Sequence, residues 1–191
     1  MRKLGDDDQK KLKDALAAAE ARTSARIVVQ TVPVSDHYRL YPLVYGGVVA
    51  LTVLAGLALG WPHMTLRLGF GITAAAAVLA VLAFDFWPLR LMAVPRQAKN
   101  WECWELAHRA FASQILARND RKTGILLFVS LGERYVEVVT DRDVDRHVPQ
   151  SIWDAVIKDF LAEAKAGRIG DALAKAVEAC TAALAEHYPP L

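Results

Sequence analysis

Residues 41–60 read YPLVYGGVVALTVLAGLALG and residues 68–84 read LGFGITAAAAVLAVLAF, and neither run contains Asp, Glu, Lys or Arg. As a helix rising ~1.5 Å per residue, the first run is roughly 30 Å long, the thickness of a bilayer's hydrocarbon core. The two runs are close in sequence, so we predict a transmembrane hairpin over residues 40–90, with spans at 41–60 and 66–86. We disfavour the alternative, two buried core helices, because a core helix seldom needs twenty residues that are apolar on every side.

The rest of the chain has the composition of a soluble domain. All 23 Lys and Arg and all 21 Asp and Glu lie outside the two apolar runs, which leaves an ordinary surface charge content there. An entirely soluble protein, a disordered tail protein and a secreted disulfide scaffold are therefore poor interpretations. The two cysteines, Cys103 and Cys180, have no CxxC or Cys/His metal spacing, and we expect both to be reduced.

Basic residues beside the spans predict the orientation. Lys and Arg near a span tend to stay on the cytoplasmic side. Between the spans the turn carries only Arg67, whereas the outer flanks carry Arg22, Arg26, Arg39, Arg90, Arg96 and Lys99. A two-pass topology with both soluble parts in the cytoplasm follows. The segment 1–13 is too charged for a cleavable signal peptide.

Small residues recur at a spacing of four on both spans. Gly56 and Gly60 form a GxxxG pattern on the first span, and Gly71 with Ala75 forms a small-xxx-small pair on the second. Such pairs let helix backbones approach closely. We favour packing within the hairpin over a dimer seam, since small residues are common in any membrane helix contact.

The soluble parts, residues 1–39 and 91–191, are together the size of one domain. Apolar periodicity predicts a helix that starts at Asp6–Asp8, a strand over 27–32, a helix over 97–118, strands over 125–131 and 135–140, a helix from Trp153 ended by Gly167, and a last helix from Asp171. In the 97–118 helix, the predicted apolar stripe consists of Trp101, Trp104, His108, Phe111 and Ile115.

The order of these elements predicts the fold class. A strand–helix–strand order favours a parallel, right-handed crossover between the strands at 27–32 and 125–131, and the wholly apolar second strand suits a sheet covered on both faces. We therefore predict an α/β, three-layer sandwich with a small mixed sheet. A two-helix transmembrane hairpin interrupts it, so residues 1–39 must pair with residues 91–191 across the hairpin.

Several segments together resemble the TPM-domain (TPM phosphatase-like) bacterial membrane proteins, in the form with a hairpin inserted in the domain. The segments are Thr23–Val29, Ser35–Arg39, Thr123–Leu131, Glu133–Glu137 and Trp153. The resemblance implies a small α/β domain attached to a bacterial plasma (inner) membrane, with a biochemical role that is mostly undefined. For some extracytoplasmic relatives it also implies weak acid phosphatase activity and calcium binding. Where those relatives carry Asp-x-Gly and an aliphatic residue, this sequence has Asp141-Arg142-Asp143-Val144, without the glycine.

Three alternating carboxylates are the candidate metal ligands. In an extended loop Asp141, Asp143 and Asp145 would lie on one side, and Ca²⁺ or Mg²⁺ prefers such oxygen clusters. An EF-hand is excluded, because its sixth position would be Arg146 and its twelfth Ile152. The simpler interpretation, which we favour, pairs these acids with Arg142 and Arg146 on a solvated face.

Other polar residues have two interpretations each. His147 could act as a general acid or base on a phosphoryl substrate, but a surface-loop histidine is the commoner case. His108, within the aromatic stripe, is more often a hydrogen-bonded core histidine than a ligand. Glu133 and Arg134 could contact a partner or mark a solvated turn. No catalytic residue is assigned, because no nucleophile with an oxyanion stabiliser is recognisable.

Nucleic acid is not an expected partner. Arg118, Asp120, Arg121 and Lys122 form a mixed cluster without interleaved aromatics, and no basic stripe is present. The same cluster, with Arg90, Arg96 and Lys99, could rest on anionic lipid headgroups.

Two functions remain in view. The first is a non-enzymatic protein-interaction or assembly module at the cytoplasmic membrane face, with the lipid bilayer and another membrane or cytosolic protein as partners. The alternative is a weak divalent-cation-dependent acid phosphatase that holds Ca²⁺ or Mg²⁺ with Asp141, Asp143 and Asp145. No other cofactor is expected.

Overall fold

The computed structural model describes residues 4–35, 38, 40–61, 63–86, 92, 94–117 and 123–190. The chain forms two compact units. We call Met1–Ser35 with Asn100–Leu191 the sheet unit, and Asp36–Lys99 the helical hairpin. The boundaries predicted at 39–40 and 90–91 fall on residues 39, 90 and 91, which lie outside the described residues.

The sheet unit is built on three strands, β1 (Arg26–Val32), β2 (Gly124–Ser130) and β3 (Tyr135–Thr140), in the order β1-β2-β3. β1 pairs with β2 in parallel, from Arg26 opposite Gly124 to Val32 opposite Ser130. β3 pairs with β2 in antiparallel fashion. The small mixed sheet, with a parallel pair formed across the hairpin, is thus confirmed.

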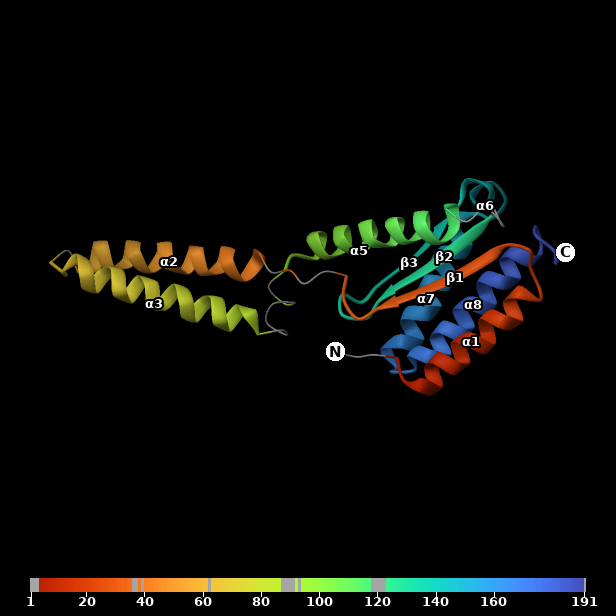
Figure 1. The fold of residues 1–191 in the computed structure, drawn as a ribbon, viewed down its shortest axis with the longest axis horizontal. Helices are drawn as coiled ribbons and strands as arrows, with labels where there is room; N and C mark the ends of the chain where they lie inside the picture. Colours follow the sequence, from red (N-terminus) through yellow and green to blue (C-terminus); the bar gives the residue numbers. More distant parts are fainter. Residues whose placement is uncertain are drawn as a thin grey trace. The chain divides into compact units, whose positions relative to one another are not determined.

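Helices cover both faces of this sheet (Figure 1). On one face lies α5 (Arg96–Phe111), which continues as a π-helical turn, η1 (Ala112–Leu116). The other face carries α1 (Asp6–Glu20), α7 (Gln150–Lys165) and α8 (Ile169–Ala185), and the short α6 (Arg142–His147) follows β3. Apolar side chains alternate along the strands, so each face has its own core and the three-layer sandwich is confirmed.

The apolar stripe predicted for α5 is partly wrong. Phe111 and Ile115 are buried against the sheet, but Trp101 and Trp104 are exposed. A second stripe with the same helical period, Cys103, Ala107 and Ala110, faces the sheet instead. Its small side chains let the helix approach Leu126 and Phe128 closely, whereas two indole rings at those positions would hold it away.

The helical hairpin consists of α2 (Leu40–Gly60) and α3 (Leu66–Asp85), which run side by side (Figure 1). Their mean hydropathies are 2.1 and 2.0, which makes both long and apolar enough to cross a membrane. Only 6% of the apolar stretch of α2 and 0% of that of α3 is buried. The core helix of a soluble protein would be mostly buried, so the alternative of two core helices does not fit these exposures.

The close contact within the hairpin is not where the GxxxG pattern predicted it. A Cβ atom added to Gly56, Gly60 or Gly71 would meet nothing within 4 Å. A Cβ at Gly46 would overlap Cγ2 of Val81 and lie 3.4 Å from the Ala77 carbonyl oxygen. The rings of Tyr45 and Phe84 stack beside this contact, with centroids 4.9 Å apart. Packing within the hairpin therefore depends on Gly46 and not on the GxxxG pair.

Replacing Gly46 with isoleucine is expected to separate α2 from α3 near Val81, because the added side chain has no space. The measurement is a distance distribution between spin labels on Thr52→Cys and Leu79→Cys, in detergent micelles. Gly56→Ile, which adds the same side chain where a Cβ has open space, is the matched control. Equal distributions for the two variants would contradict the role given to Gly46.

Candidate functional site

The carboxylate of Asp141 joins two parts of the sheet unit. It lies just after β3, is 8% exposed, and is the N-cap residue of α6. Its Oδ1 accepts hydrogen bonds from the backbone N–H groups of Asp143 and Val144, both at 2.9 Å. Its Oδ2 accepts one from the N–H of Gly124, at 2.8 Å, where β2 begins. Two buried donors and one half-buried donor thus depend on one side chain, which gives Asp141 a structural role.

The other two candidate ligands have separate partners. Asp143 Oδ2 accepts a hydrogen bond from the Tyr188 hydroxyl at 2.8 Å, and Asp145 Oδ1 accepts one from the Thr140 hydroxyl. The extended loop we predicted is wrong, because residues 142–147 form α6. Positions two apart on a helix point in nearly opposite directions, so the carboxylates of Asp143 and Asp145 diverge. Within the described ranges, no three His, Cys, Asp or Glu side chains are grouped to hold a metal ion.

The arginines between these acids do not pair with them. Arg142 and Arg146 are exposed on α6, and neither forms an ion pair in the part of the chain that the structure describes. The ion pairs that the sequence suggested there are therefore wrong. The mixed cluster at 118–122 lies outside the described residues.

A tyrosine that the sequence did not single out links Asp143 to His147. The Tyr188 hydroxyl lies 3.2 Å from Nδ1 of His147, and that nitrogen is 2.8 Å from the Asp143 carbonyl oxygen. Burial, and then the hydrogen bond to Asp143, raise the pKa of Tyr188. The hydroxyl therefore stays protonated as a donor. His147 is exposed, as expected for a surface histidine. Among the described residues, no recognisable nucleophile lies beside it.

Glu133 binds the segment after β1 to the turn between β2 and β3. Its Oε1 accepts hydrogen bonds from the backbone N–H of Ser35, at 2.9 Å, and from the Ser35 hydroxyl, at 2.8 Å. Its Oε2 accepts one from the Ser130 hydroxyl. A merely solvated turn does not describe Glu133, since its carboxylate accepts hydrogen bonds within the fold. The contact with a partner stays a prediction.

The neighbouring Cys103 and Arg134 differ from each other in exposure. The Cys103 thiol is fully buried and donates to the Ser35 hydroxyl at 3.4 Å. Burial raises the pKa of this thiol to about 11, so it is not a reactive thiolate near neutral pH. Arg134 is exposed and has a φ of 55°, the left-handed conformation required by the tight turn into β3.

A half-buried acid lies on the α5 side of β3. Glu137 accepts a hydrogen bond from the Tyr135 hydroxyl at 2.9 Å. Burial raises the pKa of Glu137, and the Tyr135 hydrogen bond and the nearby His108 oppose this. His108 itself is not the core histidine we predicted: its ring packs at a tilt against Trp104, with centroids 4.2 Å apart, and its Nδ1 is 2.9 Å from the Trp104 carbonyl oxygen. Glu137 is thus a half-buried carboxyl group whose charged form is disfavoured by burial.

The raised pKa of Glu137 predicts a pH effect on stability. The folded unit holds this proton more tightly than the unfolded chain, so stability falls as the pH rises from the ordinary Glu pKa, about 4.3, through the raised value. Glu137→Gln has no charge to desolvate and keeps an acceptor for Tyr135. It should therefore melt above the parent at neutral pH, and the difference should shrink as the solution is acidified.

The measurement is the melting temperature of the parent and of Glu137→Gln at several pH values across this range. Glu178→Gln, at an exposed position of α8, serves as the control and should melt with the parent throughout. A Glu137→Gln protein that melts below the parent at neutral pH would contradict the cost assigned to the buried charge.

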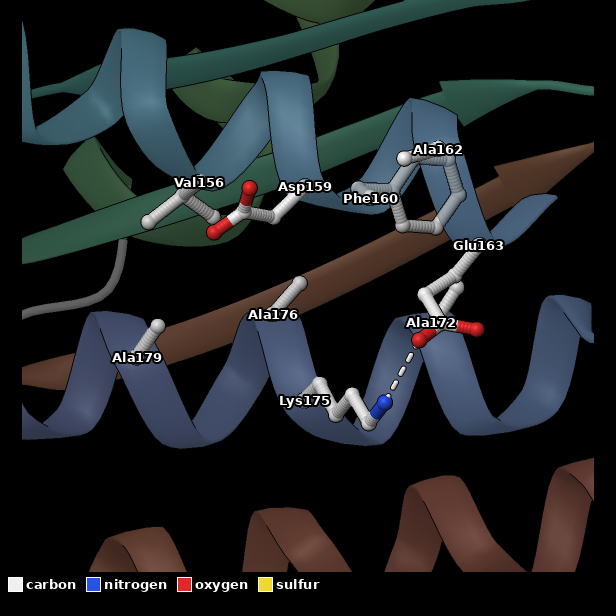
Figure 2. Close-up of a pocket in the computed structure, with 9 residues that line it drawn as sticks. All are labelled: Val156, Asp159, Phe160, Ala162, Glu163, Ala172, Lys175, Ala176 and Ala179. Atoms are coloured by element: carbon white, nitrogen blue, oxygen red, sulfur yellow. Dashed lines mark hydrogen bonds and ion pairs between the residues drawn. The ribbon is translucent and has the colours of Figure 1, made fainter. Parts of the chain in front are cut away.

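A shallow groove between α7 and α8 holds further charged groups (Figure 2). Its volume is about 290 Å³, and its walls include Ala172, Ala176 and Phe160. Glu163 Oε1 accepts a hydrogen bond from Lys175 Nζ at 2.6 Å, and Arg168 binds the other carboxylate oxygen. These hydrogen bonds lower the pKa of Glu163. Lys175 on α8 thus pairs across the groove with Glu163 on α7.

Sequence reasoning missed the residues that connect distant segments. Glu137 had a local signal, a charged residue at an inward position of the alternating strand 135–140. Tyr188 follows the last helix directly before Pro189 and Pro190, and nothing in the sequence connects it with Asp143. The contact of Ser35 with Glu133 likewise spans 98 positions.

The chain is similar to proteins of one family. The model of a family described as TPM domain matches residues 88–183, half of the chain. No curated protein matches it. The NMR structure of the BA42 protein from the psychrophilic bacterium Bizionia argentinensis matches 98% of this chain and 86% of that chain, with a TM-score of 0.57 and 16% sequence identity. At this identity the likeness shows the fold alone, and it agrees with the α/β arrangement described above.

Proposed function

Because this chain belongs to the TPM domain family, we propose that it is a membrane-anchored member whose sheet unit lies at the cytoplasmic face of a bacterial plasma membrane. There it works as a protein-interaction or assembly module. The observation that carries the proposal is the helical hairpin, two long apolar helices with almost no buried surface of their own. Apolar helices of that length are unfavourable in water and stable in a bilayer.

Extraction of the full chain tests the anchor. The protein expressed in bacteria should stay in the membrane pellet after alkaline carbonate and enter solution only with detergent. Leu54→Arg with Leu79→Arg puts charges in the middle of both helices, at a cost of about 2.5–3.5 kcal/mol each, and should lower the membrane fraction. Leu54→Ile with Leu79→Ile is the control. Release of the parent protein by carbonate would refute the anchor.

Sidedness needs introduced cysteines, because the native Cys103 and Cys180 are both buried. His63→Cys lies in the turn between α2 and α3, and Lys158→Cys lies at an exposed position of α7. An impermeant maleimide added to spheroplasts should label His63→Cys at once and Lys158→Cys only after permeabilisation. The reverse pattern would place the sheet unit outside the cytoplasm.

The use of the acidic side chains supports a non-catalytic role. Asp141 and Glu133, which could otherwise bind ions or activate water, each accept hydrogen bonds from distant segments of the fold. A module of this kind should bind its partner in saturable proportion and have no turnover. Cross-linking of a tagged copy in cells should give one discrete product that contains the partner. Overexpression of an untagged copy should remove this product by competition, which would indicate a limited number of partner sites.

The alternative, a weak divalent-cation-dependent acid phosphatase, gives a different result. Purified protein would hydrolyse phosphomonoesters at acidic pH only with Ca²⁺ or Mg²⁺, and Asp143→Ala would abolish the activity. Asp143 is suited to this test because, among the residues that the structure describes, its carboxylate accepts a hydrogen bond from one hydroxyl and from no backbone group. Cation-dependent turnover of the parent, lost in this variant, would replace the interaction module by the enzyme.

A further inference from the structure

The face of α5 turned away from the sheet carries a ladder of aromatic rings. Trp101 and Trp104 stack with centroids 5.3 Å apart, and the Trp104 ring packs at a tilt against the His108 ring, with centroids 4.2 Å apart. Trp101 is 62% exposed and Trp104 41% exposed, whereas Cys103 and Ala107 on the opposite face are fully buried. We call Trp101, Trp104 and His108 the aromatic stripe.

The stripe is unusual for a surface in water. Tryptophan is highly buried on average in soluble domains, and two exposed neighbours form an apolar patch. The ring surface with one polar N–H suits the boundary between water and lipid, where Trp is enriched. The nearest charged pair, Glu105 with Arg109, lies beside the stripe and is self-neutralising.

The stripe follows the apolar helices closely along the chain. Seven residues link the end of β1 at Val32 to the start of α2 at Leu40, and ten link Asp85 to Arg96. At ~3.5 Å per residue the shorter link spans no more than about 30 Å. Cys103, on the same part of α5 as the stripe, contacts Ser35 just after β1. The first half of α5 and the exit of β1 therefore lie together, at the end of the sheet unit that the short link leaves.

Basic residues accompany this end of α5. Arg96 and Lys99 lie in its first turn, and no acidic residue precedes Glu102 in the helix. Cations near a cytoplasmic leaflet gain about 1 kcal/mol each from anionic lipid. Arg96 and Lys99 precede Trp101 by five and two positions, which at ~100° per residue places both on the side of α5 away from the stripe. Their charge therefore favours anionic lipid at the start of α5, and the stripe is suited to the membrane surface by its exposed rings alone.

We propose that the aromatic stripe of α5 rests in the headgroup region of the membrane that α2 and α3 span. This inference rests on the proposed membrane anchor. It gives the sheet unit a fixed contact with the bilayer in addition to its two links. A protein partner on the stripe is the competing outcome.

The test uses the full chain in liposomes of phosphatidylethanolamine and phosphatidylglycerol. A nitroxide on His108→Cys reports on the stripe and leaves both tryptophans in place. A nitroxide on Leu54→Cys reports on α2. A nitroxide on Lys158→Cys, at an exposed position of α7, is the aqueous reference. Collision with oxygen and with a water-soluble nickel chelate is measured at each site.

The label at 108 should have a severalfold lower nickel accessibility, relative to oxygen, than the label at 158. Trp101→Ala with Trp104→Ala, substitutions at exposed positions, should return the label at 108 to the aqueous value. Far-UV ellipticity checks that this variant stays folded. An aqueous value at 108 with a lipid-like value at 54 would overturn this inference alone. An aqueous value at 54 would overturn the membrane anchor itself. Protection of the label at 108 in native membranes but not in liposomes would assign the stripe to a protein partner.

Discussion

Replacing Trp153 with alanine is expected to lower the free energy of unfolding of the sheet unit by about 3–5 kcal/mol. Trp153 lies on α7, is fully buried, and belongs to the core cluster between the sheet and α7 and α8. Its removal takes the largest side chain out of that core, and the rigid elements around it can close only part of the cavity. A loss of this size is a large fraction of the stability of an ordinary domain.

Trp153→Phe should be much milder. Among the residues that the structure describes, no acceptor faces the indole Nε1 of Trp153. An unsatisfied buried donor costs about 1–3 kcal/mol, so phenylalanine removes a penalty as well as some packing. We expect this variant to lie within about 2 kcal/mol of the parent.

Hydrogen exchange of the β2 amides in detergent measures both effects, because these amides are fully buried and open only when the unit unfolds. Trp101→Phe, at an exposed position of α5, is the control and should leave exchange unchanged. Equal losses for Trp153→Phe and Trp153→Ala would show that the indole has an acceptor in the folded protein.

Asp141→Ala is expected to cost about 3–4 kcal/mol, the second-largest effect. The substitution removes the N-cap of α6 and leaves the buried N–H groups of Gly124 and Val144, and the half-buried N–H of Asp143, without their acceptor. Asp141→Asn should cost less, since its amide oxygen can still serve the two donors of α6. Its NH₂ group would then face the N–H of Gly124, so part of the loss should remain.

Asp145→Ala is the matched control for Asp141→Ala. It changes the same residue type on the same helix, but Asp145 is exposed and accepts from the Thr140 hydroxyl alone among its described contacts. Its cost should stay within about 1 kcal/mol. Exchange of the amides at the start of β2 and in α6 distinguishes the two variants. Similar, small losses for both would remove the structural role assigned to Asp141.

Apolar patterning was sufficient to predict the sheet. β3 occupies the predicted residues 135–140, and β2 begins one residue before the predicted 125. Parallel pairing of β1 with β2 followed from the strand–helix–strand order, because a crossover connection of that kind is almost always right-handed and parallel. These features depend on backbone pairing and on burial, which a single sequence records directly.

The sequence failed to predict the local structure where two residue patterns fitted equally well, or where no pattern was present. On α5, the Trp101 and Cys103 stripes both repeat at helical spacing, and the choice between them depended on how closely the helix packs on Phe128. Over 141–145, alternating acids fit an extended loop as well as a six-residue helix that begins at a capping aspartate. In such a short helix the cap is the main signal, and here it outweighed the alternation.

The parallel pairing of β1 with β2 has a consequence for biosynthesis. β1 leaves the ribosome first, but its partner strand follows only after residues 33–123, which include both apolar helices. At a synthesis rate of about 5–20 residues per second, β1 waits roughly 5–20 s. During that delay its β-branched edge is open to wrong pairing, so early delivery of the nascent chain to the insertion machinery would protect it from aggregation.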